Sequence, residues 1–252
     1  MKILILAGGL GTRISEETAD KPKPMVLIGQ DPIIWHLMNI FSKQNYNEFV
    51  IALGYKGDVI RKWLSEDSRI EINELNETRP TRNVTPGSWK VTTIDTGLNT
   101  QTAGRIAQSM KVFQGERFLV TYGDGLGNVN IDELIEFHKS HGKLATVTAV
   151  RPPARFGYMK IEDNQVVHFG EKNQADEGWI NGGFFILEPE VVKYIKNDMD
   201  PFESVALPNL VKDRQLMAFH HFGFWQPMDT LREKQDLARM LNLSPPPWID
   251  FR

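Results

Sequence analysis

The chain has 252 residues, of which 41% are hydrophobic and 24% are charged, so it can bury the core of one large α/β domain. Its formal net charge of −3 argues against a nucleic-acid binder held by bulk electrostatics, and its lack of cysteine excludes disulfides and a thiol nucleophile. Because no apolar run approaches a membrane span and the N-terminus lacks a signal peptide's long apolar stretch, we expect a cytoplasmic protein without membrane contact.

Strands and helices alternate in the first part of the predicted structure. The predicted strands span residues 2–6, 48–54, 70–75, 90–95 and 118–122, and the predicted helices span 32–42, 57–64 and 102–113. This alternation indicates an α/β fold, with a mostly parallel sheet between helices and ligands at the carboxyl ends of the strands. The segment 76–89, which holds turn formers and two prolines, is predicted to be a flap or an oligomer contact.

Shorter strands follow residue 145. They are predicted at 145–150, 157–161, 165–169 and 181–187, with helices at 189–196 and 230–241. We interpret this part as a smaller, mixed and partly antiparallel β-rich region that covers the ligand crevice. The whole chain is then expected to be a single domain, residues 1–252.

The first strand runs directly into the glycine-rich stretch LAGGLGTR, residues 6–13. Glycines let a backbone approach a ligand closely and point N–H groups at phosphate oxygens, and Arg13 adds a charged fork. Neither a Walker A loop nor a dinucleotide-binding G-x-G-x-x-G motif fits, since Gly11 is followed directly by Thr12 and Arg13. A tight strand-to-helix turn is the alternative, but Thr12, Arg13 and the nearby lysines favour an anion site.

The segment DKPKPM, residues 20–25, follows this loop closely. Pro22 and Pro24 predict an extended path, on which Lys21 and Lys23 point to the same side. Lysines on loops are most often simply solvated. The closeness to the glycine loop nevertheless favours one of these lysines as a phosphate ligand.

Two aspartates are candidate ligands for Mg²⁺. Asp124 lies in TYGDG, directly after the strand 118–122. A carboxylate between glycines suits a metal that takes one or two protein carboxylates plus water and phosphates. Asp229 lies in GFWQPMDTLR, just before a predicted helix. Each has a structural alternative, a turn for Asp124 and a helix N-cap for Asp229.

Polar residues at other element ends are candidates for the remaining contacts. Arg105 lies early in the predicted helix 102–113 and faces either a phosphate or another subunit. Glu171, Lys172 and Asn181 lie at the ends of short strands, where they read a substrate's hydroxyls or phosphate, or form ordinary surface ion pairs.

These motifs resemble the sugar-1-phosphate nucleotidyltransferases. The resemblance rests on LAGGLGTR, KPKPM, DTG with TAGR, TYGDG, INGGFF and GFWQPMDTLR, which run in order from residue 3 to about 235. It implies a Rossmann-like, GT-A-like enzyme whose residues 1–144 mainly bind the nucleotide and whose residues 145–252 mainly bind the sugar phosphate. It also implies Mg²⁺ as the cofactor, a homo-oligomer, and conversion of CTP and α-D-glucose 1-phosphate to pyrophosphate and CDP-glucose, which feeds polysaccharide biosynthesis.

The resemblance further implies a role for each matched residue. Arg13, Lys23 and Asp124 would be catalytic, and Asp124 and Asp229 would hold Mg²⁺. The residues implied to bind the nucleotide are Leu6, Ala7, Gly8, Gly9, Gly11, Thr12, Arg13, Lys23, Thr100, Arg105 and Gly123. The residues implied to bind the acceptor are Tyr122, Glu171, Lys172, Asn181 and Gly182.

Two other hypotheses stay open. Glu171 and Lys172 are followed by Asn173, where the family has proline. The first hypothesis is therefore a cytidylyltransferase with another acceptor, either another sugar 1-phosphate or a non-sugar phosphate such as phosphoglutamine. The second is a non-catalytic nucleotide-binding regulator, which would have little need of the complete set of phosphate and metal residues.

Overall fold

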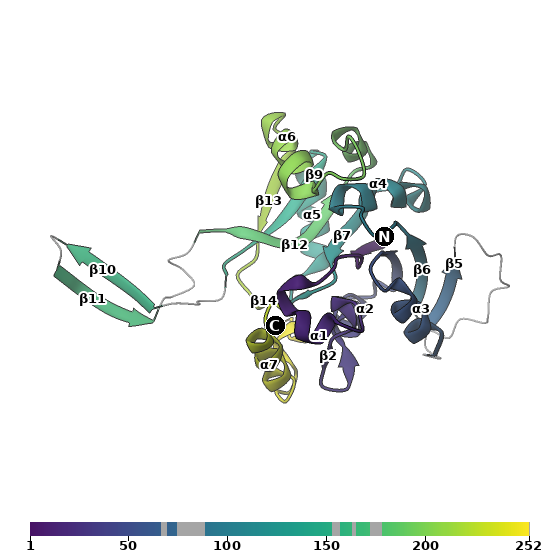
Figure 1. Ribbon diagram of the computed structural model, residues 1–252. Coiled ribbons are helices and arrows are strands. Elements are labelled where there is room, and N and C mark those ends of the chain that lie inside the picture. Colours follow the sequence, from purple (N-terminus) through teal and green to yellow (C-terminus); the bar gives the residue numbers. More distant parts are fainter. Residues whose placement is uncertain (67–69, 75–88, 153–156, 163–164, 172–177, 252) are drawn as a thin grey trace.

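The computed structural model describes residues 1–66, 70–74, 89–152, 157–162, 165–171 and 178–251 (Figure 1). The strands are β1 (Ile3–Leu6), β2 (Leu27–Ile28), β3 (Asp31–Pro32), β4 (Glu48–Leu53), β5 (Ile70–Glu74), β6 (Trp89–Asp95), β7 (Phe118–Tyr122), β8 (Gly125–Gly127), β9 (Ala145–Val150), β10 (Gly157–Glu162), β11 (Gln165–Glu171), β12 (Ile180–Leu187), β13 (Leu216–His220) and β14 (Trp225–Pro227). The α-helices are α1 (Ser15–Thr18), α2 (Ile33–Ser42), α3 (Gly57–Glu66), α4 (Thr102–Phe113), α5 (Ile131–His141), α6 (Leu207–Lys212) and α7 (Leu231–Met240). The short helical segments are η1 (Thr12–Ile14), η2 (Lys23–Met25), η4 (Pro189–Tyr194), η5 (Phe202–Ala206) and η6 (Pro247–Ile249).

Eight of the described strands form one sheet, in the order β13-β9-β12-β7-β1-β4-β6-β5. Every neighbouring pair is parallel except the two pairs of β12, which runs against both β7 and β9. The predicted mostly parallel α/β sheet is therefore confirmed.

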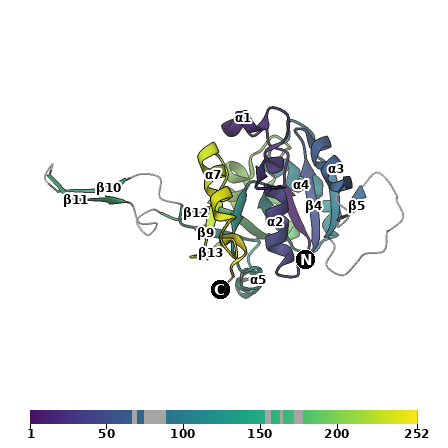
Figure 2. The same cartoon turned by 90° about the horizontal axis from the view of Figure 1, so that it is seen from below.

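The strands from residue 145 onward divide into three groups. β9, β12 and β13 extend the main sheet, and β14 pairs with β8. β10 and β11 form an antiparallel pair of their own. Figure 2 shows this pair projecting away from the body of the molecule. A cover of the crevice by this region stays a prediction.

Helices bury both faces of the sheet, which explains why β1 is a continuous apolar run. Ile3 and Ile5 belong to the hydrophobic cluster that α2, α3 and α5 complete. Leu4 and Leu6 belong to the cluster that α4, η5 and α6 complete on the other face. Side chains alternate between the faces of a strand, so all four residues of β1 are buried.

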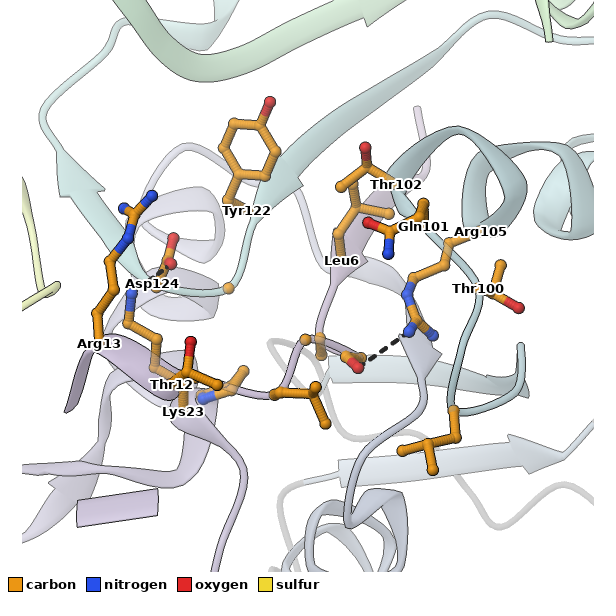
Figure 3. Close-up of a pocket in the computed structure, with 18 of the residues that line it drawn as sticks. Leu6, Thr12, Arg13, Lys23, Thr100, Gln101, Thr102, Arg105, Tyr122 and Asp124 are labelled. Carbon is orange, nitrogen blue, oxygen red and sulfur yellow. Dashed lines mark hydrogen bonds and ion pairs between the residues drawn. The ribbon is translucent and has the colours of Figure 1, made fainter. Parts of the chain in front are cut away.

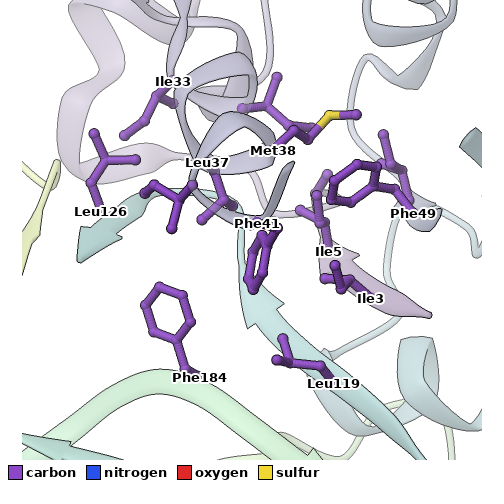
Figure 4. Packing of buried hydrophobic residues seen from close by; sticks show 14 of the residues in the cluster. Ile3, Ile5, Ile33, Leu37, Met38, Phe41, Phe49, Leu119, Leu126 and Phe184 are labelled. Atoms are coloured by element: carbon purple, nitrogen blue, oxygen red, sulfur yellow. The ribbon is translucent and has the colours of Figure 1, made fainter. Parts of the chain in front are cut away.

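Helix α2 shows how the helical period places the core. Ile33, Leu37, Met38 and Phe41 recur at helical spacing, and all four are buried. Figure 4 shows their side chains packed over the central strands, with Phe184 of β12 opposite them. The rings of Phe41 and Phe184 lie 5.8 Å apart, so α2 packs directly on β12.

A few local predictions differ from the structure. The helix predicted at 189–196 is the 3₁₀ helix η4, and β13 was not predicted. β13 (LMAFH) is an edge strand, and none of its four consecutive apolar residues is buried. The prediction of a flap at 76–89 lies outside the described residues except for Trp89. Among the described helices, none is long and apolar enough to cross a membrane.

Candidate active site

A cavity of about 540 Å³ lies at the carboxyl ends of β1, β6 and β7. Its size falls within the range of about 300–1,000 Å³ typical of small-molecule sites. The loops after these strands line it, as expected for a mostly parallel sheet. Figure 3 shows Arg13, Lys23 and Asp124 towards one end and Thr100 and Arg105 towards the other.

The cavity gathers most of the predicted site residues. Every residue implied to bind the nucleotide or the metal lines it, and so does Tyr122 from the acceptor set. The lining residues that were not predicted are Leu10, Pro24, Leu98, Asn99, Gln101, Thr102 and Met199. All of these except Met199 lie close in the sequence to predicted residues, so that proximity could have identified them as lining residues.

The glycine loop is held in a shape that only glycine adopts readily. Gly11 has a φ of 65°, in the left-handed region. Its carbonyl accepts a hydrogen bond from the Thr18 hydroxyl at 3.1 Å. At the start of the loop, the Ala7 amide donates to the Ala52 carbonyl at 3.0 Å. The loop is thus tied both to β4 and to helix α1.

Arg105 holds the loops around the cavity together. Its guanidinium donates to the carbonyls of Gly8 and Leu53 at 2.9 Å each and to that of Gly97 at 3.1 Å. These carbonyls follow or end β1, β4 and β6. Burial lowers the pKa of Arg105 from its ordinary value. The structure shows this anchoring, whereas a direct contact with the nucleotide stays a prediction.

Lys23 stands between the two predicted metal-binding carboxylates. Its Nζ lies 2.7 Å from Asp124 Oδ2 and 2.6 Å from Asp229 Oδ1. The Arg13 guanidinium donates to Asp229 Oδ2 at 3.1 Å. The side chain of Lys23 is 10% exposed and that of Arg13 is 76% exposed, so solvent screens the arginine far more.

The pKa values show that these charges support one another. Burial alone would lower the pKa of Lys23, but the carboxylates of Asp124 and Asp229 outweigh it and raise that pKa. Burial alone would raise the pKa of Asp229, but Lys23 and then Arg13 outweigh it and lower that pKa. Both groups are therefore charged at neutral pH.

Short elements bring Asp229 to Asp124. β8 follows Asp124 and pairs with β14, with Pro227 opposite Gly125. The Met228 amide also donates to the Asp124 carbonyl at 2.8 Å. Asp229 directly follows Met228, so this hydrogen bond explains how two carboxylates far apart in the sequence meet.

The N-cap of α7 is Thr230, so the alternative reading of Asp229 as the N-cap is wrong. Thr230 and Glu233 form a capping box, in which the Glu233 amide donates to the Thr230 hydroxyl at 3.2 Å. Glu233 also accepts from the Asp229 amide at 2.7 Å. The cap satisfies the backbone of Asp229 and leaves its carboxylate to Lys23 and Arg13.

In DKPKPM, Pro22 is extended and a helical turn follows it directly. Lys23–Met25 form the 3₁₀ turn η2, in which the Met25 amide donates to the Pro22 carbonyl at 2.8 Å. The fully extended path predicted from the two prolines is wrong here, because Pro24 fits the first turn of a helix. This turn buries Lys23 against the aspartates.

Asn181 and Gly182 of the acceptor set lie close to Tyr122. The Asn181 side-chain amide donates to the Tyr122 hydroxyl at 3.1 Å, and the Gly182 carbonyl accepts from the Trp225 indole at 2.8 Å. Gly183 has a φ of 82°, and a Cβ there would lie 2.6 Å from the Tyr122 ring. A glycine at this position therefore makes room for the tyrosine.

Two other residues of the acceptor set cannot be placed in the same way. Lys172 lies outside the described residues, and Glu171 is described only by its backbone at the end of β11. Glu203 was not predicted, yet its two carboxylate oxygens accept hydrogen bonds from Tyr122 and Thr102, which line the cavity. It lies in η5, where no motif marks it.

The family described as nucleotidyl transferase matches residues 2–230. The chain belongs to the nucleotidyl transferase family. It is 46% identical to the glucose-1-phosphate cytidylyltransferase of Salmonella typhi over 98% of both chains. It is 42% identical to the probable glucose-1-phosphate cytidylyltransferase of Bacillus subtilis, over 98% of this chain and 99% of that one. HddC from Yersinia pseudotuberculosis, solved in complex with GMP-PN, is 25% identical and superposes with a TM-score of 0.72, over 96% of this chain and 99% of that chain.

A divalent metal is general in nucleotidyltransferases, and the donor set of this nucleotidyltransferase fits one. Carboxylates from Asp124 and Asp229 share Lys23 and line the cavity. Among the described residues, no group of three or more His, Asp or Glu side chains could hold a metal by itself. Substrate phosphates and water would have to complete the ligand set, as is usual for Mg²⁺.

Proposed function

We propose that this nucleotidyltransferase converts CTP and α-D-glucose 1-phosphate to CDP-glucose and pyrophosphate. The near-full-length identity of 46% with the Salmonella typhi enzyme carries the choice of substrates. The cluster of Lys23, Arg13, Asp124 and Asp229 at one end of the cavity supports the chemistry.

The proposed reaction needs no general base. The second pKa of a phosphate monoester is about 6, so the acceptor phosphate is already an anion near neutral pH. One of its oxygens attacks the α-phosphorus of CTP and forms the new P–O bond. The bond from the α-phosphorus to the bridging oxygen breaks in line, and pyrophosphate leaves with the electron pair.

The main obstacle is the approach of a dianion to a polyanion, so positioning and charge neutralisation supply the catalysis. Lys23 and Arg13 place two positive charges beside the cavity. The loop of Gly8, Gly9 and Gly11 offers backbone N–H groups to phosphate oxygens. Mg²⁺ on Asp124 and Asp229 would act as a Lewis acid on the phosphate oxygens.

Residues 1–144 supply the glycine loop, Thr100 and Arg105, so we assign them mainly to the nucleotide. We assign residues 145–252 mainly to the sugar phosphate, with Asn181 and Gly182 next to Tyr122. Asp229, from this second half, completes the metal pair. The homo-oligomer and the cytoplasmic location stay predictions.

The test is a pyrophosphate-release assay with purified protein, four nucleoside triphosphates and a panel of phosphorylated acceptors. We expect release with CTP and glucose 1-phosphate to exceed that of every other combination. Greater release with a non-sugar phosphate or another sugar 1-phosphate would assign a different acceptor. No release with any pair would favour a regulator that binds nucleotide without turnover.

A further inference from the structure

Glu203 joins two residues that line the cavity. It accepts hydrogen bonds from the Tyr122 hydroxyl at 2.5 Å and from the Thr102 hydroxyl at 2.7 Å. The Thr102 hydroxyl in turn accepts from the Phe202 amide at 2.7 Å. Figure 3 shows Tyr122 between Asp124, at the cationic end, and Thr102. Glu203 thus contacts the lining of the cavity through the hydroxyl groups of Tyr122 and Thr102.

The hydrogen bonds of Tyr122 fix which way its hydroxyl can act. A tyrosine hydroxyl has one proton to donate and two positions that accept. The proton of Tyr122 goes to Glu203, and one accepting position takes the Asn181 side-chain amide. Only an accepting position remains for a ligand. Burial, and then the Glu203 carboxylate, raise the pKa of Tyr122, so the hydroxyl keeps its proton at neutral pH.

The orientation of Asn181 is fixed as well. Its Oδ1 accepts from the Gly183 amide at 2.8 Å, which leaves its nitrogen as the group that faces Tyr122. The bulge of β12 between Asn181 and Phe185 places this amide beside the tyrosine. Contacts within the protein therefore leave the Tyr122 hydroxyl as a hydrogen-bond acceptor before any substrate binds.

We propose that Glu203 is a specificity-determining positioning residue, which fixes the Tyr122 hydroxyl as the acceptor of a hydrogen bond from a sugar hydroxyl group. This inference rests on the proposed function, because it concerns the same acceptor. A hydroxyl group donates to Tyr122, whereas a carboxylate or second phosphate offers only lone pairs and meets the charge of Glu203. The site therefore favours a phosphate monoester with a neutral, hydroxylated body, held with its phosphate towards Lys23.

Glu203→Gln tests this inference, because glutamine keeps the size and removes the charge. We expect the KM for glucose 1-phosphate to rise about tenfold and the KM for CTP to stay within about twofold, as loss of one charged hydrogen bond predicts. The preference for glucose 1-phosphate over glucuronic acid 1-phosphate should fall about tenfold. Tyr122→Phe should give the same pattern, and the double variant should be no worse, because the two residues act as a unit.

Glu190→Gln is the matched control, since Glu190 is an exposed carboxylate in η4, on the same face of the sheet. Unchanged KM and unchanged preference in both Glu203→Gln and Tyr122→Phe would overturn the inference while the proposed function stands. An equal rise in both KM values would also overturn it, because Glu203 would then be a general structural tie. Absence of CDP-glucose with the wild-type protein would instead reject the proposed function and this inference with it.

Discussion

Lys23 carries the central positive charge of the site. It is buried and contacts both carboxylates, while the exposed Arg13 contacts Asp229. A divalent cation that shared these carboxylates would meet the Lys23 ammonium, and two unit charges 4 Å apart repel by about 4 kcal/mol at an effective dielectric constant of about 20. We therefore expect the metal to arrive together with the nucleotide, whose phosphates neutralise both cations.

Removal of the Lys23 charge should open the carboxylates to a metal in the absence of nucleotide. In Lys23→Met we expect Mn²⁺ to bind at least about tenfold more tightly than in the wild type, because the competing ammonium is gone. Electron paramagnetic resonance of free Mn²⁺ measures this directly. The added substitution Asp124→Asn should abolish the gain. Equal Mn²⁺ affinity in Lys23→Met and the wild type would contradict the expectation.

Asp124 allows a test of catalysis that spares the fold. Its side chain is 35% exposed, and Lys23 keeps its contact with Asp229 when Asp124 is neutralised. We expect Asp124→Asn to lower kcat on the order of 10²- to 10³-fold, the range for loss of one preorganised electrostatic contact at a reacting centre. Thermal unfolding should change little. Near-normal turnover in this variant would show that Asp124 is not a catalytic residue.

Short elements between the main strands and helices assemble the charged site. The turn η2 carries Lys23, and the three-residue pair β8–β14 brings Asp229 to Asp124. The sequence marked these residues through motifs beside strand ends. It could not reveal that β8 and β14 pair, because three-residue strands lack a hydrophobic period and are far apart along the chain. The same limit applies to Glu203, whose role depends on where η5 packs.

Helix α5 carries a buried histidine at the opposite, amino-terminal edge of the parallel strands. His138 lies 2.8 Å from the Thr146 hydroxyl and 3.2 Å from Glu188, which also pairs with Arg117 at 2.6 Å. Burial lowers the pKa of His138, and the neighbouring charges of His141 and Arg117 act in the same direction, against the attraction of Glu188. At neutral pH the folded protein therefore holds His138 uncharged.

This histidine should make folding sensitive to acid. The folded pKa lies below the unfolded value of about 6.5, so the unfolded chain binds the extra proton first. The free energy of unfolding should fall as the pH drops below about 6.5, by at most about 1.4 kcal/mol per pH unit for each such group. Urea unfolding between pH 7.5 and 5.5 measures this slope.

His138→Gln should flatten the slope without abolishing it. The pKa values of His36 and His221 are also lowered, mainly by burial, and those residues remain in the variant. A slope identical to that of the wild type would show that His138 is not among the groups responsible.

At the scale of the molecule, the sequence predicted the architecture better than the acceptor side. The helix 102–113 and the strands 118–122 and 145–150 have the predicted bounds, because their hydrophobic patterns are strong and their ends carry turn residues. The loops after β1, β6 and β7 converge, as a parallel sheet requires. On the acceptor side, specificity depends on contacts such as Tyr122 with Glu203, which residue type and spacing do not reveal.

The most direct test of the proposed function follows the oxygen atoms. Glucose 1-phosphate labelled with ¹⁸O in its phosphate is incubated with CTP, Mg²⁺ and the protein, and the products are read by ³¹P nuclear magnetic resonance. Attack by the acceptor phosphate on the α-phosphorus predicts CDP-glucose with label on its β-phosphate and in the bridge between the two phosphorus atoms, and unlabelled pyrophosphate. Label in pyrophosphate, or no CDP-glucose at all, would contradict the account.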